Sequence, residues 1–202
     1  EGALVDGEGL MSRRIGEVVG AAPTSFLSQC YTVYEAPPLG SLVRTDSPTL
    51  YGVVCHVSTE PLDPGRPVLA RGESAATEAE IFQNNPQLTR LFTTRFEALI
   101  TGHNADGLCK QYLPPLPPAV HSFVFVCSPA EVTEFTAQLD FLPLLLNSGS
   151  PVADEVAAYC LRRASAAQPD GPEFLARASK ALAAQLASDV PRLSAILRRA
   201  AS

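Results

Sequence analysis

Cys55 and His56 are the one adjacent cysteine–histidine pair in the chain. A thiol beside an imidazole is a pairing that nucleophilic catalysis uses. Both residues lie within residues 50–59, which are rich in β-branched and aromatic side chains and are predicted to form a strand. Neighbouring side chains on a strand point to opposite faces. We therefore predict a core cysteine beside a surface histidine, and not one catalytic centre.

A metal site would require the fold to gather His103, Cys109 and His121, because zinc is bound by nitrogen and sulfur ligands. None of these residues occurs in a C-x-x-C or H-x-x-x-H spacing. The five cysteines are odd in number and irregularly spaced, which favours buried, reduced thiols over a disulfide framework. We predict no metal site and no cofactor.

Paired carboxylates are another catalytic device, and Asp154 and Glu155 are adjacent. They lie in the first turn of a predicted helix, where the helix dipole favours negative side chains, and this role suffices to explain them. The chain has no G-x-S-x-G motif, and neither Lys110 nor Lys180, its two lysines, belongs to a phosphate-binding G-x-x-x-x-G-K-[ST] loop. We predict that the protein is not an enzyme.

After residue 175, five basic side chains stand against one acidic side chain. The basic residues are Arg177, Lys180, Arg192, Arg198 and Arg199. Cations near the C-terminus of a helix are ordinary partners of the helix dipole. The alternative is a basic docking patch for an acidic partner or nucleic acid, for which Arg192, Arg198 and Arg199 are the candidate residues.

The composition is that of a globular protein. The 202 residues are 46% hydrophobic and 18% charged, with a net charge of -6. This net negative charge argues against non-specific binding of nucleic acid over a broad surface. No apolar run reaches the roughly 18 residues that a membrane span needs, and residues 1–10 are acidic, unlike a signal peptide. We expect a cytoplasmic location, and we expect residues 1–12 to be a flexible leader.

Residues 13–127 alternate short apolar segments with glycine and proline, which is typical of a small barrel or sandwich. Strands are predicted at residues 15–19, 25–35, 41–45, 50–59, 96–101 and 121–127, with residues 67–71 as a further candidate. Gly52 suits a bend or bulge within its strand, and residues 102–107 are predicted to be a turn. Short helices are predicted at residues 74–83 and after Asn85.

From Ser128 onward the hydrophobic period becomes helical. Helix starts are predicted at Ser128-Pro129, Ser150-Pro151, Asp170-Gly171-Pro172 and Ser188-Asp189-Val190-Pro191. Glu131 completes a capping box with Ser128. Pro143 is a predicted kink or stop, and Tyr159 is predicted to face inward. The fold class is therefore α+β: a small β-barrel domain with inserted short helices at 13–127, followed by an α-helical bundle at 128–202.

Three segments carry a family resemblance: IGEVVG at residues 15–20, GSLV at residues 40–43 and LYGVV at residues 50–54. Residues 15–59 resemble the HAS barrel, the N-terminal module shared by HerA-type helicases and F-type ATP synthase subunits. Residues 78–118, which include EIFQNNPQLTRLFTTRFEALITGH and QYLPPLPP, look like uncharacterised HAS-barrel proteins of cyanobacteria. The resemblance implies a barrel and a cyanobacterial lineage, and it implies no reaction.

The chain differs from the HAS-barrel ATPases after the barrel, where a P-loop ATPase domain follows in those proteins. About 75 helical residues take its place, too few for a nucleotide-binding core, so we carry over no nucleotide binding and expect a complete protein rather than a fragment. HAS barrels in those ATPases mediate subunit contacts. By this analogy we expect a non-enzymatic binding or assembly module that docks on a protein partner or larger complex through barrel or C-terminal helix surfaces.

The alternative is a nucleic-acid-associated accessory protein. Small barrels bind strands through exposed aromatic side chains beside basic ones. Phe26, Tyr31, Tyr34, Arg44 and Tyr51 would supply that surface. The net acidity of the chain disfavours this hypothesis, and the oligomeric state is left open.

Overall fold

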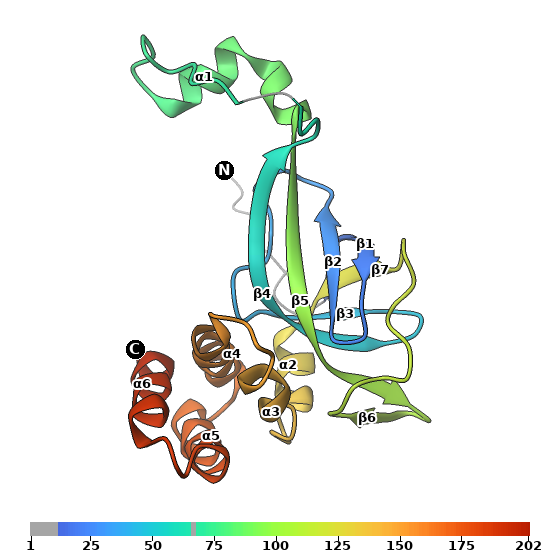
Figure 1. The fold of residues 1–202 in the computed structure, drawn as a ribbon, viewed down its shortest axis with the longest axis vertical. Helices are drawn as coiled ribbons and strands as arrows, with labels where there is room; N and C mark the ends of the chain where they lie inside the picture. The colour runs from blue at the N-terminus through green and yellow to red at the C-terminus, as the bar shows by residue number, and fades with distance from the viewer. Residues whose placement is uncertain (1–11, 66–67) are drawn as a thin grey trace, which may run out of the picture.

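The computed structural model describes residues 12–65 and 68–202. The predicted leader, apart from Ser12, and Pro67 of the candidate strand at 67–71 lie outside the described residues. The fold is mixed α+β, as predicted, with a sheet in the N-terminal part and helices in the C-terminal part (Figure 1). Among the described residues, no helix combines the length and the apolar character needed to cross a membrane.

Seven strands form one antiparallel sheet in the order β2-β1-β7-β3-β4-β5-β6, and β2 also pairs with β5. The strands are β1 Arg13–Ala21, β2 Ser25–Cys30, β3 Leu42–Thr45, β4 Leu50–Pro61, β5 Phe92–Ala105, β6 Leu108–Lys110 and β7 Phe123–Val126. The register of β4 on β5 shifts between Tyr51 and Gly52, which confirms the predicted bulge. A Cβ on Gly52 would lie 3.0 Å from the Phe26 ring, so a side chain there would crowd the core.

The two faces of the sheet contribute side chains to two different cores. One core is built from side chains of β1, β2, β3, β4, β5 and β7, with Phe26, Phe96 and Ile100 as its largest members. The other core lies between the opposite face and the helices. Alternate side chains of β4 serve both cores: Val54 enters the strand core, and Val53 packs among the helices.

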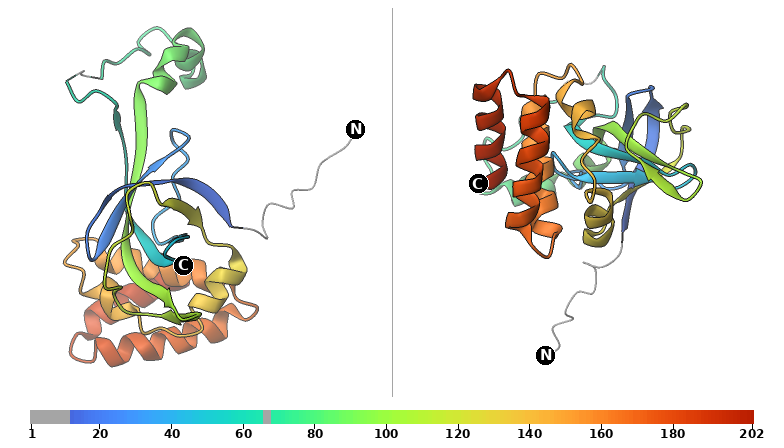
Figure 2. Two further views of the ribbon diagram at one scale, coloured as in Figure 1. Left: turned by 90° about the vertical axis from the view of Figure 1, so that its right-hand side faces the viewer. Right: turned by 90° about the horizontal axis from the view of Figure 1, so that it is seen from below.

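The C-terminal helices pack on one side of the sheet, as Figure 2 shows. They are α2 Pro129–Phe135, α3 Leu142–Leu146, α4 Ala153–Ala167, α5 Gly171–Gln185 and α6 Val190–Ala201. Ser128 and Glu131 form the predicted capping box. Asp170 and Asp189 cap α5 and α6 by accepting backbone N–H bonds of 3.0 and 3.1 Å. These helix starts were therefore predicted correctly.

Two predictions about the helices were wrong. Pro143 does not end a helix but lies in the first turn of α3, where its missing N–H leaves no intrahelical bond unmade. Tyr159 does not face inward: its side chain is 38% exposed, with the Arg162 guanidinium 4.7 Å from its ring. α4 begins at Ala153, slightly later than predicted from Ser150-Pro151.

The largest correction concerns β5. It extends from Phe92 to Ala105, so residues 102–105 belong to a strand and not to a turn, and β6 follows it. Glycine is common in turns, but Gly102 instead allows β5 and β6 to approach closely. A Cβ at this position would lie 2.6 Å from the carbonyl oxygen of Lys110. β2 also ends at Cys30 rather than at residue 35, and residues 68–71 form no strand.

Candidate functional site

The outer halves of β4 and β5 form a two-stranded arm that extends beyond the rest of the sheet (Figure 1). The β4–β5 ladder continues to the pair Pro61↔Phe92. The β2–β5 ladder ends at Arg95, and the β3–β4 ladder ends at Val53. Among the described strands, the outer parts of β4 and β5 therefore pair only with each other. Two small helices, α1 Glu78–Asn84 and the 3-10 helix η2 Pro86–Arg90, lie at the far end.

Hydrogen bonds fix the base of the arm. The Thr94 hydroxyl oxygen accepts the Tyr34 backbone N–H at 2.8 Å and lies 2.8 Å from the Thr59 hydroxyl. Thr94 is itself buried, with 1% of its surface exposed. The Tyr34 ring meets the Phe82 ring of α1 edge to face, with 6.4 Å between centroids. The loop after β2 thus braces the arm.

The arm tip, defined as residues 60–65 and 68–92, has apolar side chains but little core. Neither α1 nor η2 contains a buried residue. Leu62 is 60% exposed and Leu69 is 67% exposed. Contiguous exposed apolar surface on a folded protein marks an interaction site. The tip therefore has the character of a binding element.

A groove of about 470 Å³ runs through the tip. Its apolar lining, which we call the tip groove, includes Pro61, Leu62, Leu69, Leu88, Leu91 and Phe92. Asp63 and Arg71 are charged residues at its wall. A cleft of this size and chemistry accommodates a few apolar side chains of a partner.

The predicted docking arginines are placed differently from one another. Arg192 donates to the Asp154 carboxylate at 2.7 to 3.0 Å and to the Leu146 carbonyl oxygen at 3.0 Å. The hydrogen bond with Asp154 raises the pKa of Arg192. Arg199 Nε lies 3.1 Å from Glu155. Arg198 is exposed and forms no ion pair within the described residues.

Asp154 and Glu155 lie in the first turn of α4, as predicted, and each is bound by an arginine of α6. Two of the three candidate docking arginines therefore hold α6 against α4. From the sequence, only the helix dipole was predicted to stabilise these carboxylates. Arg192 is 38 residues from Asp154, so no local pattern indicates that the two side chains pair.

The remaining candidate residues are scattered. Cys55 is buried and His56 is exposed, which confirms the prediction for this pair. His103 is buried with Nδ1 3.1 Å from the Tyr112 carbonyl oxygen, Cys109 is exposed, and His121 Nδ1 lies 3.0 Å from Glu17. Within the described residues, no cluster of three or more His, Cys, Asp or Glu side chains is suited to hold a metal ion.

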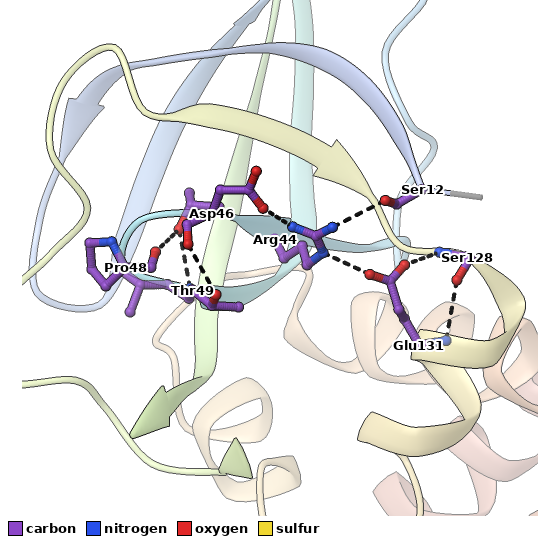
Figure 3. Close-up of polar contacts among 9 residues, drawn as sticks. Ser12, Arg44, Asp46, Pro48, Thr49, Ser128 and Glu131 are labelled. Atoms are coloured by element: carbon purple, nitrogen blue, oxygen red, sulfur yellow. Dashed lines mark hydrogen bonds and ion pairs between the residues drawn. The ribbon is translucent and has the colours of Figure 1, made fainter. Parts of the chain in front are cut away.

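A polar joint connects the sheet to the helices (Figure 3). The Arg44 guanidinium of β3 donates to Glu131 at 2.7 Å and also contacts Asp46 and Ser12. The same Glu131 carboxylate accepts the Ser128 backbone N–H at 2.6 Å. Burial acts to raise the pKa of Glu131, but these hydrogen bonds from Ser128 and Arg44 outweigh burial and hold that pKa below its ordinary value.

The five residues proposed from the sequence as a nucleic-acid surface do not lie on one exposed surface. Phe26 is 1% exposed and belongs to the strand core, and Tyr51 packs on Phe135 with 4.8 Å between ring centroids. Arg44 belongs to the polar joint. Tyr31 and Tyr34 are exposed. That set of five residues was wrong as a single binding surface, because the packing of the sheet turns Phe26 into the strand core and Tyr51 onto Phe135.

A different basic–aromatic cluster involves β1 and β7. The Arg14 guanidinium lies 4.7 Å from the Phe123 ring centroid and 5.6 Å from the Tyr31 ring centroid. Both rings are exposed. The Tyr31 hydroxyl donates to Glu17 at 3.0 Å. Sequence reasoning missed this cluster because its members come from distant segments.

Comparison with known proteins assigns no family: no protein-family model matches the chain, and no curated protein matches it. The arm therefore has to be interpreted from its own geometry.

Proposed function

We propose that this chain is a non-enzymatic binding or assembly module that docks on a larger protein complex, with the tip groove as its docking surface. The observation that carries the proposal is an apolar groove at the end of a projecting arm. This site differs from the barrel and C-terminal helix surfaces favoured by the sequence, since two of the three candidate arginines are engaged within the fold.

Energetics favour a partner for the tip. Burying an exposed leucine side chain contributes roughly 1.5–3 kcal/mol. Leu62 and Leu69 leave most of that contribution unused within the described chain, since both are more than half exposed. The arm is ordered by the β4–β5 ladder and by the hydrogen bond from Tyr34 to Thr94 at its base. A pre-ordered apolar surface binds with a smaller entropic penalty than a flexible one.

The proposal includes the fold family. We propose that the sheet is a small closed barrel of the HAS type, in the 13–127 domain of a cytoplasmic protein of cyanobacterial lineage, followed by the 128–202 helical domain. Support comes from the strand pairing, since each of β1, β2, β3, β4, β5 and β7 has at least two partners, and from the core those six strands share. HAS barrels mediate subunit contacts in the ATPases, which agrees with a role in assembly.

A shortened arm tests the docking proposal. Residues 62–91 are replaced by an Asn-Gly turn that joins Pro61 to Phe92, which are paired across the ladder. We expect the full chain to co-purify with a defined partner from its native host and the short-arm variant to lose it. Glu134→Lys, at an exposed position outside the tip and the α4–α6 helices, is the matched variant and should retain the partner. Retention of the partner by the short-arm variant would overturn the assignment.

The Arg14 cluster favours a second candidate function, a nucleic-acid-associated accessory role. Exposed aromatic rings beside an arginine are the elements of a stacking surface for single strands. A gel shift at low salt with the full chain and with Arg14→Ala tests this function. Retardation that depends on Arg14 would support it, and no retardation at low salt would remove it.

A further inference from the structure

We propose that the arm tip of one chain docks on the α4–α6 end of a second copy, so that copies assemble head to tail. This inference rests on the proposed function, because it names the partner of the tip groove. Charge, apolar surface and the shape of the molecule each bear on it.

The arm tip is acidic. Residues 60–92 contain five carboxylates against three arginines. The carboxylates are Glu60, Asp63, Glu73, Glu78 and Glu80. Within the part of the chain that the structure describes, none of them lies within 4 Å of a basic nitrogen, whereas six other ion pairs are formed. The tip therefore presents negative charge that its own described neighbours do not neutralise.

The opposite end of the molecule is basic. Residues 153–202, which span α4 to α6, contain seven cations against five carboxylates. Arg192 and Arg199 pair with carboxylates of α4. The other five form no ion pair among the described residues: Arg162, Arg163, Arg177, Lys180 and Arg198. Their charge complements that of the tip.

The α4–α6 helices also expose apolar side chains. Val190, at the start of α6, is 61% exposed, and Val152, at the start of α4, is 38% exposed. Such side chains are of a size that the tip groove accommodates, and the opposite net charges of the two ends set the orientation. Complementary charges around an apolar centre are the usual anatomy of a specific interface.

The shape of the molecule makes the contact intermolecular. Figure 1 places α1 and the α4–α6 helices at opposite ends of the long axis, so a tip does not meet the helices of its own chain. Docking one end on the opposite end of the next copy is a heterologous contact. Such contacts produce rings where the rotation closes and filaments where it does not.

Sedimentation of the full chain tests the inference. In about 0.02 M salt, where the screening length exceeds 20 Å, we expect oligomers, and in about 0.5 M salt we expect a shift to monomer. Two charge-reversed variants are compared: Glu60→Lys with Glu73→Lys in the tip, and Lys180→Glu with Arg198→Glu in the helices. Each alone should stay monomeric in low salt, and an equimolar mixture of the two should assemble again.

Glu134→Lys with Asp140→Lys is the matched control, because both residues are exposed and lie outside the tip and α4–α6. It should assemble like the unmodified chain. A chain that is monomeric in low salt at every concentration, a control that dissociates as fully as the tip variant, or a mixture that fails to assemble would overturn the inference. A monomeric chain that still captures a different partner through its tip would leave the proposed function standing.

Discussion

The Arg44 guanidinium lies 2.7 Å from the Glu131 carboxylate, and this contact joins β3 to the first turn of α2. Glu131 is also the acidic member of the capping box, so one side chain both starts the helix and attaches it to the sheet. The Arg44 guanidinium in turn lies 4.9 Å from the Phe125 ring centroid of β7. Sheet and helices are therefore coupled at this point.

Removing Arg44 should lower stability. Arg44→Ala leaves the partly buried Glu131 carboxylate without its charged donor, and we expect the free energy of unfolding to fall by about 2 kcal/mol. Arg13→Ala is the control, because the Arg13–Glu35 pair is exposed and such pairs contribute about 0.5 kcal/mol. Urea unfolding measures both. Equal effects of the two substitutions would contradict the role of the polar joint.

Glu131 should also make stability depend on pH. Its pKa in the folded protein is below the ordinary value of 4.5, so the folded state binds fewer protons than the unfolded chain as pH falls through this range. This contribution is fully present above about pH 5 and is lost at lower pH. Glu131→Gln should flatten the decline in unfolding free energy between about pH 5 and about pH 3. An unchanged decline would show that other carboxyl groups account for it.

Gly40 should resist substitution more than Gly107 does. Both have positive φ, 77° and 75°. A Cβ at Gly40 would lie 2.5 Å from the Cys160 backbone nitrogen of α4, whereas a Cβ at Gly107 would meet nothing within 4 Å. Gly107→Ala should lower the unfolding free energy by about 1 kcal/mol and Gly40→Ala by several times as much. Similar losses would mean that the backbone at Gly40 and α4 do not approach closely.

One cysteine should react in the folded protein. Cys109 is exposed, and the other four are buried. Burial raises the pKa of Cys30 to about 11 and of Cys55 and Cys160 to about 12, so these thiols hold their protons. A bulky thiol reagent should label one equivalent at neutral pH and all five after denaturation, and Cys109→Ser should abolish the native labelling. Rapid labelling of further thiols would contradict the packed cores.

The local features of this fold could be predicted from the sequence. Ser128, Asp170 and Asp189 each cap a helix by accepting the backbone N–H of the residue three positions further on. Both partners of each cap therefore lie within one helical turn, where a local sequence pattern reveals them. Gly102 could not be interpreted in the same way, because its role depends on Lys110 of a strand whose pairing is tertiary.

The candidate site was missed for a related reason. Leu62 lies in a turn-rich stretch and Leu69 in the candidate strand at 67–71, and neither pattern marks a binding surface. What makes them a site is the extension of β4 and β5 beyond Arg95, and that depends on where β2 stops pairing. The sequence also does not show which charged side chains pair within the fold. Arg192 and Asp154 pair only because the tertiary structure brings α6 onto α4.

Photo-crosslinking shows directly whether the arm tip is the docking surface. A crosslinking residue is placed at Leu69 in the tip groove or, as a matched position, at Leu116 between β6 and β7, since these leucines are 67% and 74% exposed. In the native host, we expect a covalent protein adduct from position 69 and none from position 116. An adduct from position 116 alone, or no adduct from either position, would contradict it.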